Sequence, residues 1–212
     1  MRTIDLPTWP RRVQFEMYKS FDYPHFNLCA NVDLTAFLPY VKGHGISPTI
    51  AIVYLIARTA NETPAFRLRI HGELVVEHEV VHPSHTVLTS GDLFSFCTIT
   101  YKQEFNMFLK DAEQRIAQVK EHPTLQDAPG EDNLLFMTAI PWVSFTSFMH
   151  PIHLNPIDSV PRFAWGRFFK QGDRTLMPFS VQVHHALMDG LHVGRYYEKI
   201  QGYLEDPGST LD

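Results

Sequence analysis

The residues best suited to chemistry lie near the C-terminus, in the segment 181–190, which reads VQVHHALMDG. A pattern His-x-x-x-Asp-Gly, formed by His185 and Asp189-Gly190, follows a run with the alternation of a β-strand. In that alternation His185 continues an apolar row that includes Val183, whereas His184 points to the opposite face. An imidazole on an apolar face loses hydration, which disfavours its charged form and leaves a neutral ring able to accept a proton. We therefore predict that His185 is a general base.

The same residues also fit a purely structural interpretation. Asp189-Gly190 could form only a tight turn, because Asp is a good N-cap for a following helix and Gly permits unusual dihedral angles. The three fixed residues of the pattern do not choose between a catalytic loop and a helix cap. Both interpretations therefore stay open at this level.

The elements that must position this segment are predicted from apolar periodicity and turn signals. Ser47-Pro48 is typical of a helix start, and His122-Pro123 is typical of a helix end. We expect helical segments over residues 13–18, 34–42, 48–61, 105–119 and 191–204. We expect strands over residues 26–32, 66–70, 73–77, 85–89, 93–100, 134–138, 142–148, 161–169 and 175–184, with a surface loop over 126–133. This mixed order predicts an α+β or two-layer α/β fold in one domain spanning residues 1–212, and no glycine-rich phosphate loop interrupts it.

Composition restricts the class of protein. Of the 212 residues, 44% are hydrophobic and 19% are charged, as in ordinary globular proteins. The formal net charge is −5 and the Lys and Arg residues do not cluster, which argues against a nucleic-acid partner. Cys29 and Cys97 have no metal-ligand spacing. Because we find no signal-peptide pattern and no apolar run of membrane-spanning length, we expect a cytoplasmic protein without membrane or metal partners.

Several motifs, in the same order along the chain, resemble the chloramphenicol acetyltransferases. They are the HHALMDG run at 184–190, HVGR at 192–195, PWVSFTSF at 141–148, W-x-R-R-x-x-F-E at 9–16, DLTAFL at 33–38, YLIAR at 54–58 and GELV at 72–75. The similarity extends over nearly the whole chain. It implies a two-layer sandwich with a large mixed β-sheet and flanking helices, assembled as a homotrimer with an active site at each subunit interface.

The resemblance also implies a reaction. Acetyl-CoA would be the co-substrate, the acceptor would be a hydroxyl of chloramphenicol or a related small molecule, and antibiotic resistance would be the biological role. His185 matches the general base of the family, which takes the proton from the acceptor hydroxyl as that hydroxyl attacks the thioester directly. Asp189 matches a structural carboxylate paired with an arginine at the position of Arg11, although Arg11 could equally be a surface charge beside Arg12.

Further positions match the substrate sites of the family. Tyr18, Phe26 and Phe94 match aromatic parts of the acceptor pocket, and Ile152 lies in the segment that forms another part of its wall. Trp142 and Phe168 match positions near the CoA channel, although aromatic residues in strands more often pack in a core.

Three departures from the family pattern fall at these sites. Thr138 replaces a serine that donates to the oxyanion, and its extra methyl group stiffens the side chain. Ala164 replaces a threonine of the acceptor site that helps to position a water molecule. After Phe148 the family usually has a polar-Leu-Asn-Val run, whereas this chain reads MHPIH at 149–153. His150, His153 and His184 lack Cys or carboxylate partners at ligand spacing, which argues against a metal site there.

Two other functions compete with this interpretation. The catalytic cores of dihydrolipoyl acyltransferases share the His-x-x-x-Asp-Gly pattern, but they normally carry lipoyl and subunit-binding domains upstream, for which we see no room here. A non-catalytic trimeric descendant would be compatible with Thr138 and Ala164, whereas His185, Asp189 and Arg11 argue against it.

Overall fold

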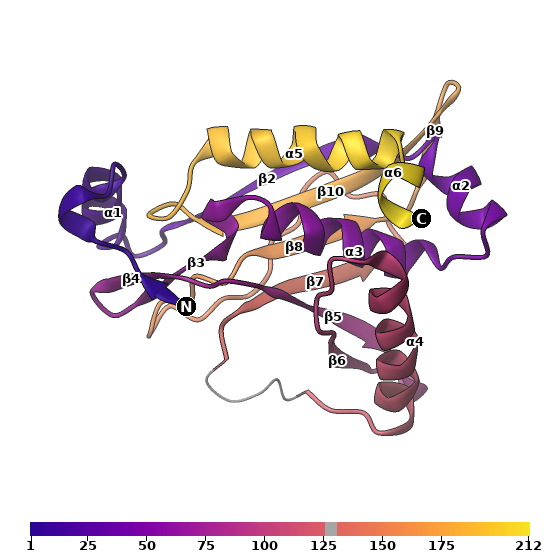
Figure 1. The fold of residues 1–212 in the computed structure, drawn as a ribbon, viewed down its shortest axis with the longest axis horizontal. Helices are drawn as coiled ribbons and strands as arrows, with labels where there is room; N and C mark the ends of the chain where they lie inside the picture. The colour runs from indigo at the N-terminus through magenta and orange to yellow at the C-terminus, as the bar shows by residue number, and fades with distance from the viewer. Residues whose placement is uncertain (126–130) are drawn as a thin grey trace.

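The computed structural model describes residues 1–125 and 131–212, and its largest element is a mixed β-sheet (Figure 1). Within these residues the sheet has seven strands in the order β2-β10-β8-β7-β5-β6, with β9 paired to β10. The strands are β2 (His25–Asp33), β5 (His82–Leu88), β6 (Phe94–Thr98), β7 (Leu134–Ile140), β8 (Arg162–Gly166), β9 (Phe169–Gln171) and β10 (Arg174–His184). β7 pairs in parallel with β5 and β8, and the remaining pairs are antiparallel. The prediction of a large mixed sheet is therefore confirmed.

A second sheet, separate from the first, is formed by three short strands in the order β1-β4-β3. They are β1 (Arg2–Thr3), β3 (Leu68–His71) and β4 (Leu74–Glu77). The predicted hairpin around His71-Gly72 is present, because His71 pairs with Leu74 and Gly72 adopts a φ of +61°. A positive φ at this turn is a conformation that glycine adopts at little cost.

Helices cover one face of the large sheet, and α3 and α5 run along it (Figure 1). The helices are α1 (Arg12–Tyr18), α2 (Phe37–Gly43), α3 (Pro48–Asn61), α4 (Phe105–Glu121), α5 (Gly190–Glu205) and α6 (Gly208–Leu211), with short 3-10 turns η1 (Leu6–Thr8), η2 (Pro64–Arg67) and η3 (Ser90–Asp92). Tyr196 of α5 is fully buried against Phe179 of β10 and Phe66, and its hydroxyl donates to the Ile56 carbonyl at 2.9 Å. The odd-numbered residues of β10 thus face the helices, as the predicted alternation requires.

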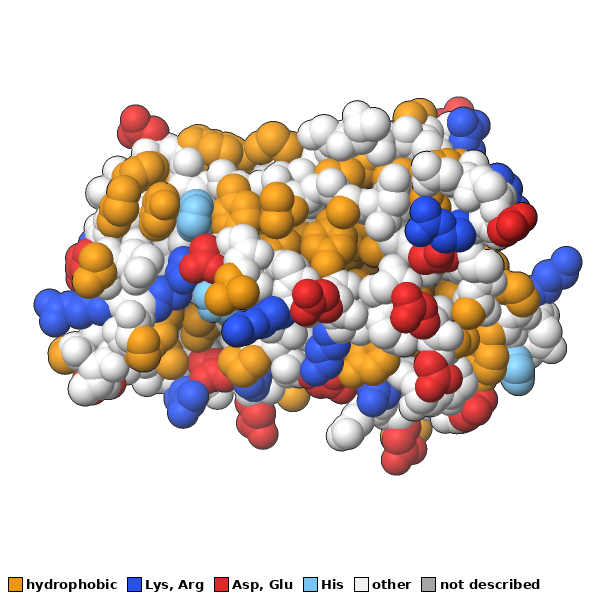
Figure 2. All heavy atoms as spheres, turned by 90° about the horizontal axis from the view of Figure 1, so that it is seen from above, with side chains coloured by type: hydrophobic (Ala, Val, Ile, Leu, Met, Phe, Trp, Pro, Cys, Tyr) orange, Lys and Arg blue, Asp and Glu red, His pale blue; other side chains and the backbone are white. Residues whose placement is uncertain are grey.

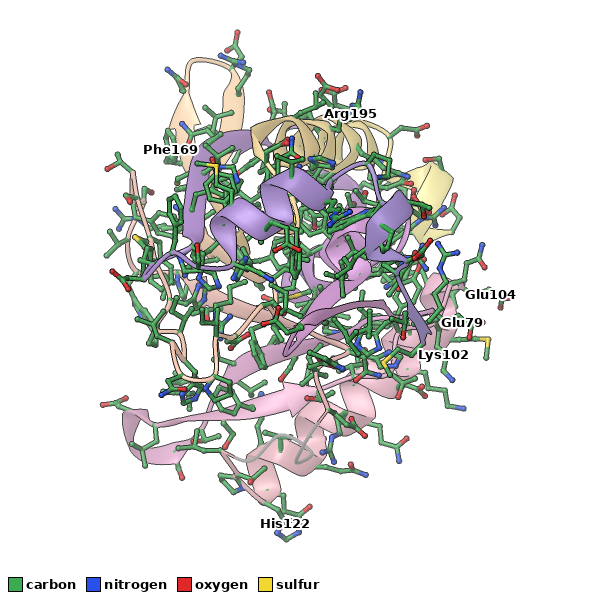
Figure 3. The ribbon with its side chains drawn as sticks, turned by 90° about the vertical axis from the view of Figure 1, so that its left-hand side faces the viewer. Glu79, Lys102, Glu104, His122, Phe169 and Arg195 are labelled. Carbon is green, nitrogen blue, oxygen red and sulfur yellow. The ribbon has the colours of Figure 1, made fainter. Side chains whose placement is uncertain are left out.

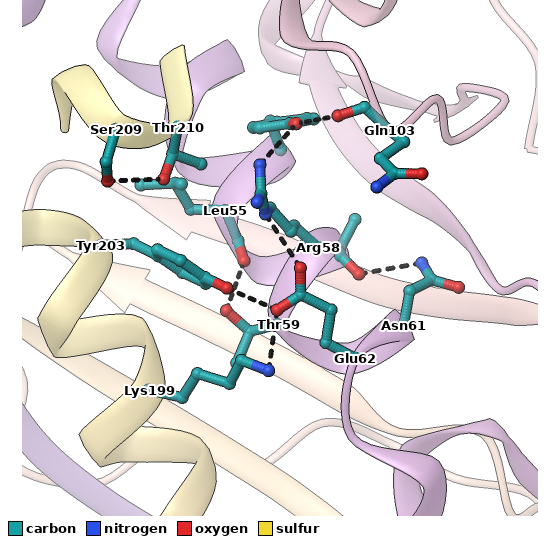
Figure 4. Close-up of polar contacts among 12 residues, drawn as sticks. Leu55, Arg58, Thr59, Asn61, Glu62, Gln103, Lys199, Tyr203, Ser209 and Thr210 are labelled. Atoms are coloured by element: carbon teal, nitrogen blue, oxygen red, sulfur yellow. Dashed lines mark hydrogen bonds and ion pairs between the residues drawn. The ribbon is translucent and has the colours of Figure 1, made fainter.

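A polar network holds α3 against α5 (Figure 4). The carboxylate of Glu62, at the end of α3, accepts from Arg58 at 3.0 Å, from Lys199 at 2.7 Å and from the hydroxyl of Tyr203. The Arg58 guanidinium also lies 5.2 Å from the centre of the Tyr203 ring. Partial burial opposes ionisation of Glu62, but these donors outweigh it and lower the pKa of the carboxyl.

The outer surface carries charges of both signs. On the face seen from above α5, Lys and Arg side chains lie among Asp and Glu side chains and around apolar areas (Figure 2). Glu79, Lys102 and Glu104 project from another side of the molecule (Figure 3). Of the helices in the described ranges, none combines the length and apolar character needed to cross a membrane.

The predicted strand at 142–148 is wrong, because these residues form turns and irregular backbone. Two of their backbone carbonyls form hydrogen bonds that are not strand pairing. The Val143 carbonyl accepts from the Arg167 amide at 2.9 Å, and the Phe148 carbonyl accepts from the Ser180 hydroxyl at 2.9 Å. The bond to Val143 also explains why the predicted strand at 161–169 breaks after Gly166 and resumes as β9.

The remaining differences concern the ends of elements. The helix predicted from residue 34 begins at Phe37, because Asp33 accepts from the Thr35 amide at 2.8 Å in a turn that precedes it. Phe66 and Arg67 belong to η2 and not to a strand. Part of the loop predicted at 126–133 lies outside the described residues.

Candidate functional site

His185 follows the last residue of β10 and is held by the sheet. β10 pairs with β2 from Leu176 to His184, and the His185 amide then donates to the Pro24 carbonyl at 2.7 Å. Every residue of β10 from Leu176 onward is buried. The backbone at His185 is therefore fixed by the core of the large sheet, even though His185 itself lies just outside the strand.

Arg11 binds the loop that follows β10. Its guanidinium donates to the Asp189 carboxylate at 2.7 Å, to the His185 carbonyl at 2.8 Å and to the Ala186 carbonyl at 3.3 Å. The Arg11 side chain is 11% exposed, whereas its neighbour Arg12 is an exposed residue. Arg11 is thus a structural element of this loop and not a free surface charge.

Asp189 serves the loop and the helix at the same time. Its carboxylate accepts from Arg11, from the Leu191 amide at 3.1 Å and from His192 Nδ1 at 2.8 Å, and it caps α5. Partial burial opposes ionisation of Asp189, but the hydrogen bonds from Arg11 and His192 outweigh it and hold the pKa of the carboxyl well below its usual range. Asp189 therefore caps α5, as the structural interpretation of the sequence predicted, and it also forms the ion pair with Arg11 that the resemblance implied.

Aromatic rings set the orientation of the His185 imidazole. The Tyr18 ring stacks on it with centroids 4.0 Å apart and planes 5° from parallel, and the Phe26 ring lies 4.7 Å away. Nδ1 of His185 is buried without a hydrogen-bond partner among the described residues. Nε2 is therefore the nitrogen that can reach a substrate.

Thr138 lies on β7 beside a cavity of about 870 Å³. The cavity is mainly apolar and is bounded by β5, β6 and β7 together with the segment that follows β7. Four of the predicted site residues line it, the predicted oxyanion donor Thr138 together with Phe94, Trp142 and Ile152. Trp142 is 62% exposed, so it lies at the mouth of the cavity and not in the core.

Ala164 and Phe168, which were also predicted at the substrate and cofactor sites, do not reach this cavity. Ala164 is fully buried between Thr138 of β7 and Ser180 of β10, its register partners. Phe168 is half-buried and packs against the hydrophobic core. Neither residue is among those that line the cavity.

The other predicted site residues fall into two groups within one chain. Arg11, Tyr18, Phe26 and Asp189 surround His185, and none of these five residues lines the cavity beside Thr138. A base and an oxyanion donor must both reach the same tetrahedral intermediate, the base at the attacking oxygen and the donor at the former carbonyl oxygen.

Sequence comparison places the chain in a family. The family model for chloramphenicol acetyltransferase matches residues 1–201. A chloramphenicol acetyltransferase of Klebsiella sp is 36% identical over 208 residues, which cover 96% of this chain and 94% of that protein. The chain belongs to the chloramphenicol acetyltransferase family. A chloramphenicol acetyltransferase of Proteus mirabilis is 34% identical, with the same coverage of both chains.

Solved structures agree with this family assignment at the level of the fold. A chloramphenicol acetyltransferase structure superimposes with a TM-score of 0.85 at 23% identity, covering 96% of this chain and 99% of that one. A dihydrolipoamide acetyltransferase from Azotobacter vinelandii gives a TM-score of 0.70 at 15% identity, covering 94% of this chain and 88% of that one. Both comparisons show a shared fold.

The cavity beside Thr138 has a polar end that the sequence analysis did not predict. His150, Asp158 and Arg162 line it. Arg162 is only 6% exposed and donates to the Asp158 carboxylate and, at 2.8 Å, to the Val160 carbonyl. Burial lowers the pKa of His150 to about 4, and both of its ring nitrogens are buried without a partner among the described residues. The unusual MHPIH run was the one sequence signal for this end, since nothing local marks Asp158 and Arg162.

Two more buried histidines lie behind the His185 loop. His184 Nδ1 accepts from the Ala186 amide at 3.2 Å, and His25 Nε2 lies 2.7 Å from the Asp158 carbonyl. Their rings meet edge to face with centroids 4.9 Å apart. Burial lowers the pKa of His184 to about 3 and also lowers the pKa of His25.

Proposed function

We propose that this protein transfers the acetyl group of acetyl-CoA to a hydroxyl of chloramphenicol or of a related small acceptor. Family membership supports the reaction. The observation that supports His185 as the general base is that Arg11 fixes the loop around this residue. The imidazole is stacked on Tyr18, and its backbone is bound by Arg11 and Pro24. A general base needs this kind of fixed orientation toward the hydroxyl that it deprotonates.

In this mechanism His185 Nε2 takes the proton of the acceptor hydroxyl as the hydroxyl oxygen attacks the thioester carbon. The Thr138 hydroxyl donates to the oxyanion of the tetrahedral intermediate. The intermediate then collapses as its C–S bond breaks, and the His185 imidazolium returns the proton to the departing thiolate, which leaves as CoA. Because the acceptor attacks directly, no acyl-enzyme forms. Trp142, at the mouth of the cavity, would contact CoA, while Phe94 and Ile152 would contact the acceptor.

We propose that the reaction also uses more than one copy of the chain. His185 does not line the cavity beside Thr138 in a single chain, so we propose a homotrimer in which His185 of one copy meets the cavity of the next. Apolar side chains near both groups are solvent-exposed in the single chain, including Leu28 at 40%, Phe94 at 48% and Val143 at 53%. Contact between copies would remove this apolar surface from water, which favours association.

The test of the reaction is the release of free CoA from acetyl-CoA by the purified protein, with and without chloramphenicol. We expect chloramphenicol-dependent release, and we expect His185→Ala to lower it at least about a hundredfold without loss of the assembly. His122→Ala changes an exposed histidine and is the matched control. Acetyl-CoA binding with no release for chloramphenicol would point to another acceptor, whereas loss of acetyl-CoA binding would support a non-catalytic protein.

A second experiment tests the shared site. His185→Ala and Thr138→Val chains are each expected to be nearly inactive alone. Co-expressed in one cell, they should form mixed trimers that regain part of the activity, because an intact Thr138 of one chain meets an intact His185 of the other. If both residues act within one chain, mixing restores nothing.

A further inference from the structure

A cluster of metal-ligating side chains lies outside the site described above, between the small sheet and the start of β7. His71 ends β3, His78 follows β4 directly, and Asp132 precedes β7 by two residues. His71 Nε2 lies 2.7 Å from one oxygen of the Asp132 carboxylate, and His78 Nε2 lies 2.8 Å from the other. The ligand atoms of all three side chains fall within 4.8 Å of one another. None of the three residues lines the cavity beside Thr138.

The backbone under each of these side chains is fixed. The turn at Gly72 sets His71 opposite Leu74, and the His78 amide donates to the Arg67 carbonyl at 3.0 Å. The Asp132 carbonyl accepts from Arg69 Nε at 2.7 Å. Three ligands on fixed backbone need little ordering when an ion binds, so little of the binding free energy is lost to entropy.

Arg69 makes this framework rigid. Its side chain is fully buried, and it also donates to the carbonyls of Phe66 at 3.0 Å and Leu134 at 2.6 Å. One guanidinium therefore joins the Phe66 carbonyl to the carbonyls of Asp132 and Leu134 at the entry to β7. The ligand cluster is located where the small sheet meets the large one.

Two imidazole nitrogens and one carboxylate oxygen are a donor set for a borderline divalent ion such as Zn²⁺, which binds nitrogen at about 2.0–2.1 Å and carboxylate oxygen at about 2.0–2.2 Å. In the bound state each Nε2 would direct its lone pair at the ion in place of its present contact with the carboxylate. The side chain of His71 is 40% exposed and that of His78 is 12% exposed, so solvent reaches the cluster from one side and could complete the coordination.

We propose that His71, His78 and Asp132 form a zinc site that ties the β3–β4 hairpin to the first residues of β7. The site is independent of acetyl transfer, since its residues belong to neither group around His185 or Thr138. The competing interpretation is a pair of Asp–His hydrogen bonds with no ion. The two differ in whether Zn²⁺ binds with one equivalent per chain through these three residues.

The experiment is a calorimetric titration of chelator-dialysed protein with zinc chloride at pH 7.5. We expect one equivalent per chain with micromolar or tighter affinity, together with a rise in Tm when zinc is in excess. His78→Asn and Asp132→Asn should each weaken this binding at least about tenfold. His122→Asn, which alters an exposed histidine at the end of α4 (Figure 3), should leave it unchanged.

Absence of saturable binding, or binding that survives both His78→Asn and Asp132→Asn, would overturn the proposal. If either variant fails to fold, X-ray absorption of the zinc-loaded unmodified protein still decides the question. Two imidazole ligands with oxygen donors support the site, whereas sulfur ligation or three or more imidazoles place zinc elsewhere. CoA release does not enter the test, so failure of the proposed acetyl transfer would leave it intact.

Discussion

The Arg11 guanidinium lies 2.7 Å from the Asp189 carboxylate, although 178 positions separate the two residues along the chain. The same guanidinium binds the carbonyls of His185 and Ala186. One side chain from the N-terminal part of the chain therefore holds the His185 loop at three points. Arg11 thus fixes the backbone that carries the His185 imidazole.

Arg11→Lys should lower kcat about tenfold to a hundredfold with little change in the KM for acetyl-CoA. A lysine ammonium lacks the planar fork that reaches three acceptors, and a displacement of about 1 Å at a reacting group can cost a hundredfold. Steady-state kinetics measures both constants. Arg12→Lys is the matched control, because Arg12 is exposed and has the same charge and size. Equal kinetics for the two variants would show that the three contacts do not position His185.

The sequence was sufficient for elements whose signals are local. Ser47 with Pro48 correctly marked the start of α3, and strand alternation correctly separated His184 from the row that leads to His185. The pattern His-x-x-x-Asp-Gly left open whether Asp189 belongs to a catalytic loop or only caps the following helix, because a cap and an ion pair with Arg11 would use the same carboxylate. Only the position of Arg11 in three dimensions shows that both occur.

The features that were missed depend on contacts between distant segments. Residues 142–148 have the composition of a strand, but their carbonyls bond to Arg167 and Ser180, which no local pattern reveals. His71, His78 and Asp132 are also brought together only by the small sheet and the buried Arg69. The separation of His185 from the Thr138 cavity is a property of the fold that residue types do not encode.

The protein should lose stability steeply between about pH 6.5 and pH 4. Burial lowers the pKa of His85 and His150 to about 4 and that of His184 to about 3. In this range the histidines are protonated in the unfolded chain but still neutral in the folded chain. The free energy of unfolding is therefore largest above the unfolded-state pKa of histidine and decreases as the pH falls. Each histidine contributes up to about 1.4 kcal/mol per pH unit. Urea unfolding across this range measures the slope.

His150→Leu should flatten that slope, because it removes one buried histidine whose ring has no hydrogen-bond partner among the described residues. His122→Asn is the control, since its imidazole is exposed in the folded protein as in the unfolded chain. A slope that is the same for the unmodified protein and for His150→Leu would mean that His150 is not held neutral by burial.

Thr138→Ser should maintain or raise kcat, whereas Thr138→Val should lower it about a hundredfold to a thousandfold. Serine keeps the hydroxyl and removes the methyl group that stiffens the side chain, and valine keeps the shape but removes the donor. The comparison is made in the CoA-release assay at saturating acetyl-CoA. A clear fall in kcat for Thr138→Ser, with an unchanged Tm, would show that the methyl group is adapted to this site and that our argument about the donor is wrong.

Gly166→Ala should disrupt the segment that carries Trp142. A Cβ atom at Gly166 would lie 2.7 Å from the Val143 carbonyl oxygen and 3.1 Å from the Phe145 ring. The backbone oxygen cannot yield as a flexible side chain would, so the segment must move away from β8 and lose the hydrogen bond from the Arg167 amide. Because Trp142 and Thr138 line the same cavity, we expect a higher KM for acetyl-CoA and a lower Tm. Gly202→Ala is the control, since a Cβ there meets nothing within 4 Å; equal behaviour of the two variants would mean that this close approach does not shape the cavity.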